Sequence, residues 1–237
     1  MSTQTEALAS SEPHSRREVV IVAHGIGAVS WTMLPLVYRL RNAGFRVINW
    51  GYQSALRSID DHVRRLVREL RELEDQADVD VIHLVGHSMG SIICRAAVTT
   101  HSDWRKLGRL VMLTPPNRGS VVARHLGPWL SWLSPAVPQL SDEPESYVNQ
   151  LGVPGLETAV FAASLDHVVP LSSTHLPDER LFRVFPGLHT TIPWRQDVSC
   201  QVVSFLRDGH PLDDEPPSAL PDTTPQITAT TPDNLTE

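Results

Sequence analysis

A serine flanked by glycines carries the clearest chemical signal in the sequence. The run Gly86-His87-Ser88-Met89-Gly90 follows an apolar segment, IHLV, and precedes a helical pattern, SIICRAAV. A serine between a strand and a helix lies on a sharp, strained turn that glycine neighbours permit, and the first amides of the helix point at an oxyanion formed on a substrate. The pattern therefore predicts that Ser88 is a nucleophile, whereas His83 and His87 beside it are expected to be structural.

A serine nucleophile requires a histidine, and His189 has the best position for that role. Serine attacks well only when a histidine takes its proton and a carboxylate orients the histidine, and the expected chain order here is serine, acid, histidine. Among the eleven histidines, His189 follows the last apolar run and Pro186-Gly187 and precedes the final helical pattern. His175 is the runner-up.

Asp166 is the predicted orienting carboxylate. It lies in FAASLDHVVPLSS, directly after the apolar run Thr158–Ala163, and so on a loop at the carboxyl end of a strand. Asp178 also precedes His189, and chain order alone leaves it open. We therefore expect Ser88, Asp166 and His189 to act together.

A second glycine-containing loop, Ala23-His24-Gly25-Ile26-Gly27, follows the first apolar run. Its glycines allow the backbone to approach a ligand closely, and such a loop supplies one oxyanion donor beside the amide that follows the serine. The expected donors are the N–H groups of Ile26 and Met89. His24 precedes the nucleophile in the chain, and we expect it to brace its loop by hydrogen bonding.

These residues need a parallel sheet that gathers its loops at one edge. Six short apolar runs are typical of buried parallel strands: Glu18–Ala23, Phe45–Trp50, Asp80–Val85, Arg109–Thr114, Thr158–Ala163 and Leu181–Phe185. Helical patterns lie between or after them: Trp31–Ala43, Ser58–Gln76, Ser88–Thr100 and Trp194–Leu206. The alternation predicts a three-layer α/β domain of about six mostly parallel strands, with its site at the carboxyl ends of the strands.

The proline-rich segment 115–155 interrupts the alternation and is expected to be an insertion or flap. Its apolar stretch Leu126–Leu140 holds too many prolines for a long helix. Trp129, Leu130 and Trp132 in this stretch are candidates to contact an acyl chain or a lipid surface. An inward-facing satellite core is an equal alternative.

Composition limits the domain organisation. The six Trp, five Phe and three Tyr all lie between Glu18 and Arg207, which predicts one domain over 18–207 and disordered segments at 1–17 and 208–237. The net charge is −7, and the seven acids of segment 208–237 account for all of it. The domain is then formally neutral and lacks the basic stripe that nucleic-acid binding requires.

Several other classes find no support in the residue pattern. The two cysteines, Cys94 and Cys200, show no metal-ligand spacing, so neither a disulfide framework nor a metal or other cofactor is expected. No apolar run is long enough for a secretion signal or a membrane span. We expect a cytoplasmic protein without stable membrane insertion, and the oligomeric state stays open.

Several of these segments together resemble the α/β-hydrolase family and, within it, the small bacterial lipases and esterases: VVIVAHGIG, HLVGHSMGS, the Asp166 loop and Gly187-Leu188-His189. Residues 114–120, TPPNRGS, are similar to a TPxxGS loop common in lipases. The resemblance spans about residues 18–207. It implies the α/β-hydrolase fold and the following roles: Ser88 nucleophile, His189 base, Asp166 orienting acid, Ile26 and Met89 amides as oxyanion hole.

The activity implied by this resemblance is hydrolysis of a small-molecule or lipid carboxylic ester through an acyl-enzyme. Acyl transfer or thioester hydrolysis would use the same three residues, and the sequence does not separate them from ester hydrolysis. A non-catalytic binding protein on a hydrolase fold is a further alternative. A dehalogenase is disfavoured because it needs a carboxylate nucleophile where Ser88 stands.

Overall fold

The protein folds around one six-stranded parallel sheet. The computed structural model describes residues 17–54, 56–130 and 134–212. Its strand order is β2-β1-β3-β4-β5-β6, and every neighbouring pair is parallel. The strands are β1 (Glu18–Ala23), β2 (Arg46–Trp50), β3 (Val81–His87), β4 (Leu107–Leu113), β5 (Thr158–Ala163) and β6 (Leu181–Phe185). The predicted fold class is confirmed.

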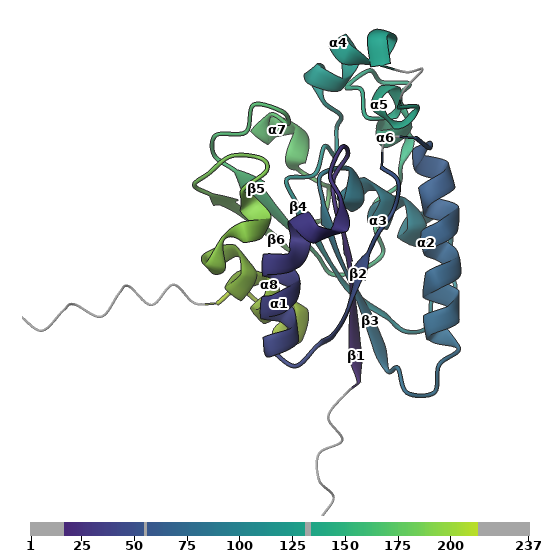
Figure 1. The fold of residues 1–237 in the computed structure, drawn as a ribbon, viewed down its shortest axis with the longest axis vertical. Coiled ribbons are helices and arrows are strands. Elements are labelled where there is room, and N and C mark those ends of the chain that lie inside the picture. The colour runs from purple at the N-terminus through teal and green to yellow at the C-terminus, as the bar shows by residue number, and fades with distance from the viewer. Residues whose placement is uncertain (1–16, 55, 131–133, 213–237) are drawn as a thin grey trace, which may run out of the picture.

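Helices cover both faces of the sheet (Figure 1). One face packs against α1 (Leu34–Asn42) and α8 (Gln196–Asp208), and the other against α2 (Ile59–Glu74) and α3 (Met89–Thr100). Successive residues of β1 alternate between the two apolar cores, with Val20 and Val22 on the α1 side and Ile21 on the α2 side. Because both sides of the strands are buried, their sequences read as continuous apolar runs.

Local sequence signals fix where the helices begin. The first turn of α2 is closed by a capping box, in which the Asp61 amide donates to Ser58 Oγ (3.2 Å) and Asp61 Oδ2 accepts from the Ser58 amide (3.3 Å). The expected helix Trp31–Ala43 is divided: a 3₁₀ turn, η1 (Ser30–Met33), precedes α1, which has Pro35 in its first turn, where no intrahelical N–H bond is lost.

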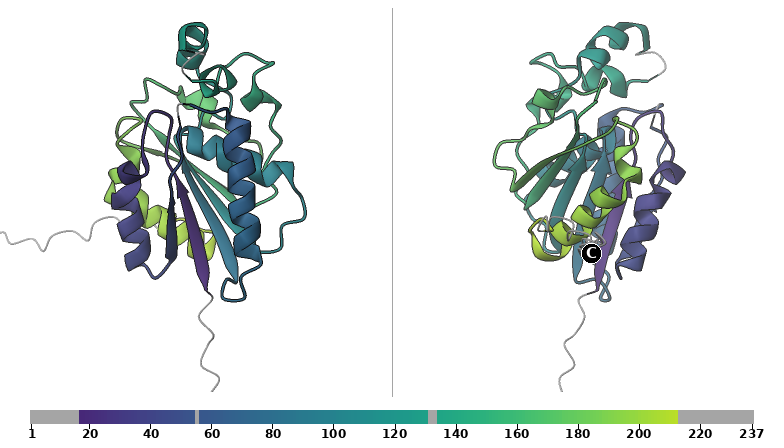
Figure 2. Two further views of the ribbon diagram at one scale, coloured as in Figure 1. Left: turned by 45° about the vertical axis from the view of Figure 1, so that its right-hand side comes forward. Right: turned by 90° about the vertical axis from the view of Figure 1, so that its left-hand side faces the viewer.

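The proline-rich insertion forms short helices that lie above the carboxyl ends of the strands (Figures 1 and 2). They are α4 (Val121–Leu130), α5 (Ala136–Gln139) and α6 (Tyr147–Gln150); α7 (Leu171–Thr174) and η2 (Ile192–Trp194) follow β5 and β6. Part of the stretch Leu126–Leu140 is therefore helical, in pieces of ten residues or fewer.

The described chain continues past residue 207, the end of the domain expected from the sequence. Helix α8 ends at Asp208, and Gly209 follows it in the left-handed conformation (φ +72°). The Leu212 amide donates to Gln201 Oε1 (3.1 Å), so residues 209–212 fold back onto α8. Apart from Arg17 and residues 208–212, the two segments predicted as disordered lie outside the described residues. In the described chain, no helix has the length and apolar character that crossing a membrane requires.

Candidate active site

Ser88 lies on a strained turn between β3 and α3. Its backbone has φ +52° and ψ −121°, a conformation that a non-glycine residue adopts only where its surroundings enforce it. The Ser88 amide donates to the Leu113 carbonyl on β4 (2.9 Å), and the Ser91 amide donates to the Ser88 carbonyl (2.9 Å). These bonds hold both sides of the turn.

The two glycines that flank the turn leave no room for a side chain. A Cβ atom on Gly86 would lie 2.4 Å from the backbone of Ser91, and one on Gly90 would lie 2.4 Å from the carbonyl oxygen of Ala23. The end of β1, the end of β3 and the start of α3 are therefore in direct backbone contact. The glycines of the motif serve this close packing.

The loop after β1 lies against Ser88. A Cβ atom on Gly25 would lie 3.2 Å from Ser88 Cβ and 3.2 Å from His87 Nδ1. Helix α3 begins at Met89, whose amide has no intrahelical acceptor, and the Ser88 side chain does not cap it. The structure thus brings the loop of Ile26 and the first amide of α3 to the same serine.

His189 and Asp166 are joined by a direct hydrogen bond. His189 Nδ1 donates to Asp166 Oδ2 at 2.7 Å, and the two side chains are 9% and 2% exposed. Burial alone would raise the pKa of Asp166. The hydrogen bonds from His189 and from the Val169 and Val168 amides outweigh burial, so this pKa lies below its ordinary value. A charged carboxylate on Nδ1 leaves Nε2 of His189 free to accept a proton.

The alternative acid and base do not join this pair. His175 bonds through Nδ1 to Glu179 (2.7 Å) and stacks on Phe182, with ring centroids 3.8 Å apart. In the described chain, no hydrogen bond joins Asp178 to His189, and Asp178 lies on a left-handed turn (φ +60°).

His87 connects His189 to the serine turn. Its Nε2–H donates to the His189 carbonyl (3.0 Å), and the two ring centroids are 5.2 Å apart. Burial, followed by the nearby His189, lowers the pKa of His87 to about 3, so this ring stays neutral. Among the described residues there is no hydrogen bond between the Ser88 hydroxyl and the His189 ring. In unliganded enzymes such a bond is often long and shortens when substrate binds.

Two further histidines brace the strands. His24 Nδ1 donates to the Gly25 carbonyl (2.9 Å), and its ring stacks on Tyr52, whose hydroxyl donates to the His24 carbonyl. His83 Nδ1 accepts from the Arg109 amide (2.9 Å). Burial lowers the pKa of His24 and lowers that of His83 to about 4.

The candidate substrate residues lie on or near α4. Trp129 is 77% exposed, so it does not pack inward as a satellite core would require. The side chain of Leu130 and all of Trp132 lie outside the described residues. Ala136 and Leu140 are buried further along the same stretch, so the inward-facing alternative holds for those positions.

A buried arginine, which the sequence patterns did not single out, connects the insertion to α3. Arg95 of α3 donates to the carbonyls of Asn117 (3.1 Å), Leu151 (2.6 Å) and Gly152 (3.0 Å), near the two ends of segment 115–155. Burial lowers the pKa of Arg95 to about 10. Arg95 is the only charged residue in the apolar helical pattern SIICRAAV, and this was the sequence signal that could have predicted a buried, hydrogen-bonded arginine.

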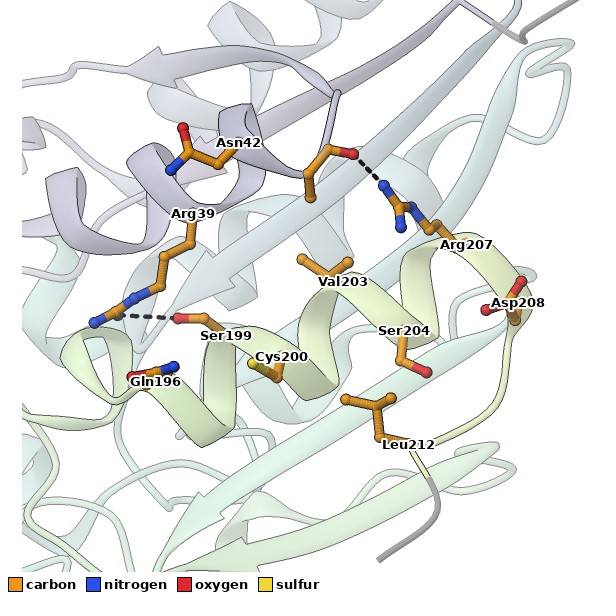
Figure 3. Close-up of a pocket in the computed structure, with 11 residues that line it drawn as sticks. Arg39, Asn42, Gln196, Ser199, Cys200, Val203, Ser204, Arg207, Asp208 and Leu212 are labelled. Carbon is orange, nitrogen blue, oxygen red and sulfur yellow. Dashed lines mark hydrogen bonds between the residues drawn. The ribbon is translucent and has the colours of Figure 1, made fainter. Parts of the chain in front are cut away.

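A cavity of about 440 Å³ lies between α1 and α8 (Figure 3). Cys200 and Val203 line it, and Arg39 on its rim donates to Ser199 Oγ (3.2 Å). None of the predicted site residues reaches it, so it is separate from the Ser88 turn. In the described residues, no three His, Cys, Asp or Glu side chains form a group that could hold a metal ion.

The chain belongs to the alpha/beta hydrolase family, whose profile matches residues 19–232. The resemblance expected from the sequence motifs is therefore confirmed. Two solved structures show the same fold. Bacillus licheniformis lipase BlEst2 in its mature form has a TM-score of 0.66 at 16% identity, covering 83% of this chain and 94% of that one. The monoacylglycerol lipase of Paleococcus ferrophilus has a TM-score of 0.54 at 18% identity, covering 79% and 93%.

A curated relative shares a shorter segment. The 2-hydroxy-6-oxononadienedioate/2-hydroxy-6-oxononatrienedioate hydrolase 1 of Pseudomonas putida is 34% identical over 110 residues, which are 41% of this chain and 36% of the relative. The match thus spans little more than a third of the length of that relative.

Proposed function

We propose that this chain is a serine hydrolase that cleaves carboxylic esters through an acyl-enzyme. Ser88 is the nucleophile, His189 the base and Asp166 the orienting acid. One observation carries the proposal: His189 donates a hydrogen bond of 2.7 Å to Asp166. The backbone carbonyl of His189 in turn accepts a hydrogen bond from His87, the residue next to Ser88. The family membership and the lipase neighbours support it.

The mechanism follows from the chemistry of these groups. His189 Nε2 takes the proton of Ser88 Oγ, which attacks the ester carbonyl, while Asp166 stabilises the imidazolium. The amides of Ile26 and Met89 bind the oxyanion, and each such donor lowers the barrier by about 3 kcal/mol. His189 then protonates the departing alcohol and activates the water that releases the acid.

Exposed apolar side chains around the site favour an ester with an apolar acyl chain. Leu165 and Val168 follow β5, Leu188 follows β6, and Trp129 lies on α4 above the strands. Apolar groups gathered beside a polar site are typical of a surface that binds an apolar ligand. We therefore propose that hydrolysis of p-nitrophenyl esters accelerates from acetate to laurate; equal rates would contradict the apolar acyl site.

The serine role is tested with a matched pair of variants. Ser88→Ala is expected to fold normally, to lower kcat by about 10⁴- to 10⁶-fold and to lose labelling by a serine-directed fluorophosphonate. Ser91→Ala is the control, because its buried hydroxyl has no hydrogen-bond partner and lies one helical turn away. It is expected to keep activity and labelling. Labelling of Ser88→Ala at the wild-type rate would exclude Ser88 as the nucleophile.

The same assay separates the neighbouring activities. Added alcohol or thiol acceptors that capture the acyl group would indicate acyl transfer, and faster turnover of a thioester would indicate a thioesterase. A folded wild-type protein that neither turns over esters nor takes up the label would be a binding protein.

The curated relative favours a second candidate substrate class. Its name specifies dienedioates, which are dicarboxylates, and the shared 110 residues are 34% identical. Oxo-dienedioates therefore belong in the substrate panel. Faster turnover of these compounds than of any ester would favour this class over the apolar ester.

A further inference from the structure

A second cavity, of about 650 Å³, lies beside the end of β2 and the first half of α2. The loop 51–53 forms one wall, and side chains from the start of α2 form the other. The charged and titratable residues that line it are Arg57, Asp61, His62, Arg64, Arg65 and Arg68. None of them belongs to the proposed ester site.

The cavity carries an excess of positive charge. Four guanidinium groups and one carboxylate line it, which leaves an excess of three. Asp61 is engaged by Arg64 (2.6 Å) and by the Ser58 hydroxyl (2.8 Å). Arg65 lies over the ring of Trp50, 5.3 Å from its centroid. Within the described chain, Arg57 and Arg68 have no acidic partner.

Several other exposed arginines of the protein are neutralised by acids. Arg46 pairs with Asp78 (3.3 Å), and Arg105 pairs with Asp75 (3.6 Å). On α2 itself, Arg71 lies outside the cavity and pairs with Asp103 at 2.6 Å. In the part of the chain that the structure describes, Arg41 and Arg207 also lack acidic partners, but each donates to a backbone carbonyl, of Val47 and Ala43 respectively. The feature particular to this cavity is that four arginines line one concave place beside a single carboxylate.

The N-terminal amides of α2 are not expected to bind a ligand in this cavity. The first amides of α2 already have acceptors, because the Ile59 amide donates to Gln139 Oε1 (2.6 Å) and the Asp61 amide to Ser58 Oγ (3.2 Å). A ligand in this cavity would be held by the arginine side chains. Guanidinium groups donate paired hydrogen bonds that match phosphate oxygens.

A buried histidine links the cavity to the loop of Ile26. His62 lines the cavity, is 1% exposed and has an Nε2 atom with no hydrogen-bond partner. Its ring meets Tyr52 edge-on, with centroids 4.6 Å apart, and Tyr52 stacks on His24 of the loop that carries Ile26. The ring of His62 thus forms part of the wall of the cavity and connects it through Tyr52 to the loop after β1.

We propose that this cavity is a binding site for a phosphate ester, contacted directly by Arg57 and Arg68. Its volume lies in the range of small-molecule sites and exceeds that of inorganic phosphate alone, so it accommodates the group to which the phosphate is attached. The phosphate comes either from a soluble metabolite or from a lipid headgroup, and both present the same dianion or monoanion to the arginines. The site does not depend on the proposed ester hydrolysis.

Calorimetric titration with glycerol 3-phosphate at low salt tests the site. The double variant Arg57→Gln/Arg68→Gln is expected to bind about tenfold more weakly or worse than wild type. The control Arg46→Gln/Arg105→Gln removes the same charge from arginines outside the cavity and is expected to bind like wild type. Ser88→Ala is also expected to bind like wild type. Unchanged circular dichroism and melting temperature check that the variants fold.

Vesicle sedimentation separates the two sources. Phosphatidylcholine vesicles with and without phosphatidic acid are compared: retention only with phosphatidic acid, lost in Arg57→Gln/Arg68→Gln, identifies a headgroup, and glycerol 3-phosphate binding without retention identifies a soluble ester. Equal binding by pocket and control variants, absence of binding to both probes, tighter binding of glutarate than of glycerol 3-phosphate, or loss of binding in Ser88→Ala would overturn the proposal.

Discussion

The serine turn and the insertion above it are built in opposite ways. At the turn, backbone meets backbone: Gly86 and Gly90 are fixed by neighbouring main chain, and Ser88 is held in a strained conformation. The insertion consists of short helices, and one buried side chain, Arg95, fastens both of its ends to α3. The proposed chemistry therefore rests on the region of close backbone packing. The proposed choice of substrate rests on the region that buries a few apolar residues and is tied to α3 by polar side-chain contacts.

Matched glycine substitutions, one in each region, are expected to give the largest difference in stability. Gly90→Ala is expected to destabilise the protein by about 3 kcal/mol, because its Cβ would meet the Ala23 carbonyl, although helix propensity alone favours alanine by about 1 kcal/mol. Gly155→Ala in the insertion meets nothing within 4 Å and is expected to be neutral or stabilising by less than about 1 kcal/mol. Urea denaturation of both measures the difference, and equal effects would remove the contrast.

Two arginines test how the insertion is held: Arg95 on α3 and Arg124 within the insertion itself. Arg95→Met leaves three carbonyls without their donor and is expected to cost about 2 to 3 kcal/mol, with faster proteolysis in segment 115–155. Arg124→Met removes a single partly exposed pair with Asp142 (3.4 Å), in which the two side chains are 42% and 22% exposed, and is expected to cost less than Arg95→Met, about 1 kcal/mol. If Arg95→Met melts like wild type and resists protease equally, the insertion is held by other contacts.

Acid is expected to destabilise the folded protein through buried histidines such as His83 on β3. The pKa of His83 is about 4 in the folded protein and near 6.5 in an unfolded chain, so the unfolded state takes up a proton first as the pH falls. The stability is therefore complete above about pH 6.5 and decreases toward pH 4, by about 2 kcal/mol at pH 5 for this histidine.

Urea denaturation at pH 7 and pH 5 measures this loss. In His83→Asn the part due to His83 should disappear, whereas His125→Asn, an exposed position on α4, should keep the wild-type difference. An unchanged pH dependence in His83→Asn would contradict the assignment.

The smallest expected effect on stability is at Trp129. Trp129→Ala is expected to change stability by less than about 0.5 kcal/mol, because the ring is exposed, and to lower the rate with laurate esters severalfold while sparing acetate esters. Tyr38→Ala, at a position on α1 that is 66% exposed, serves as the control and should alter neither rate. A uniform loss across both chain lengths would separate Trp129 from acyl binding.

The sequence predicted the sheet well because each strand is buried on both faces. All six apolar runs became strands, with β1, β5 and β6 at the predicted residues and the other bounds shifted by two residues or fewer. Helix α1 started later than expected because Pro35 belongs to its first turn and a 3₁₀ turn precedes it. The periodicity of apolar residues does not distinguish these two kinds of helical turn.

Strand order accounts for the part of the candidate site that could be predicted from the sequence. Ser88, Asp166 and His189 each follow a parallel strand, so their positions at one edge of the sheet could be expected from the chain, whereas their catalytic roles stay a prediction. Arg95 was missed because its partners, Asn117, Leu151 and Gly152, lie up to 57 residues away on an irregular segment. The arginine cavity was missed for a similar reason, since periodicity assigns Arg64 and Arg68 to an exposed helix face and does not show the loop 51–53 that encloses them.

Gln139 couples the insertion to the first turn of α2. Its side chain, on α5, accepts from the Ile59 amide (2.6 Å) and donates to Asp60 Oδ2 (3.0 Å), which joins the insertion to the first turn of α2. Displacing α5 would remove both of these bonds at once. The stability of the first turn of α2 is therefore coupled to the placement of α5.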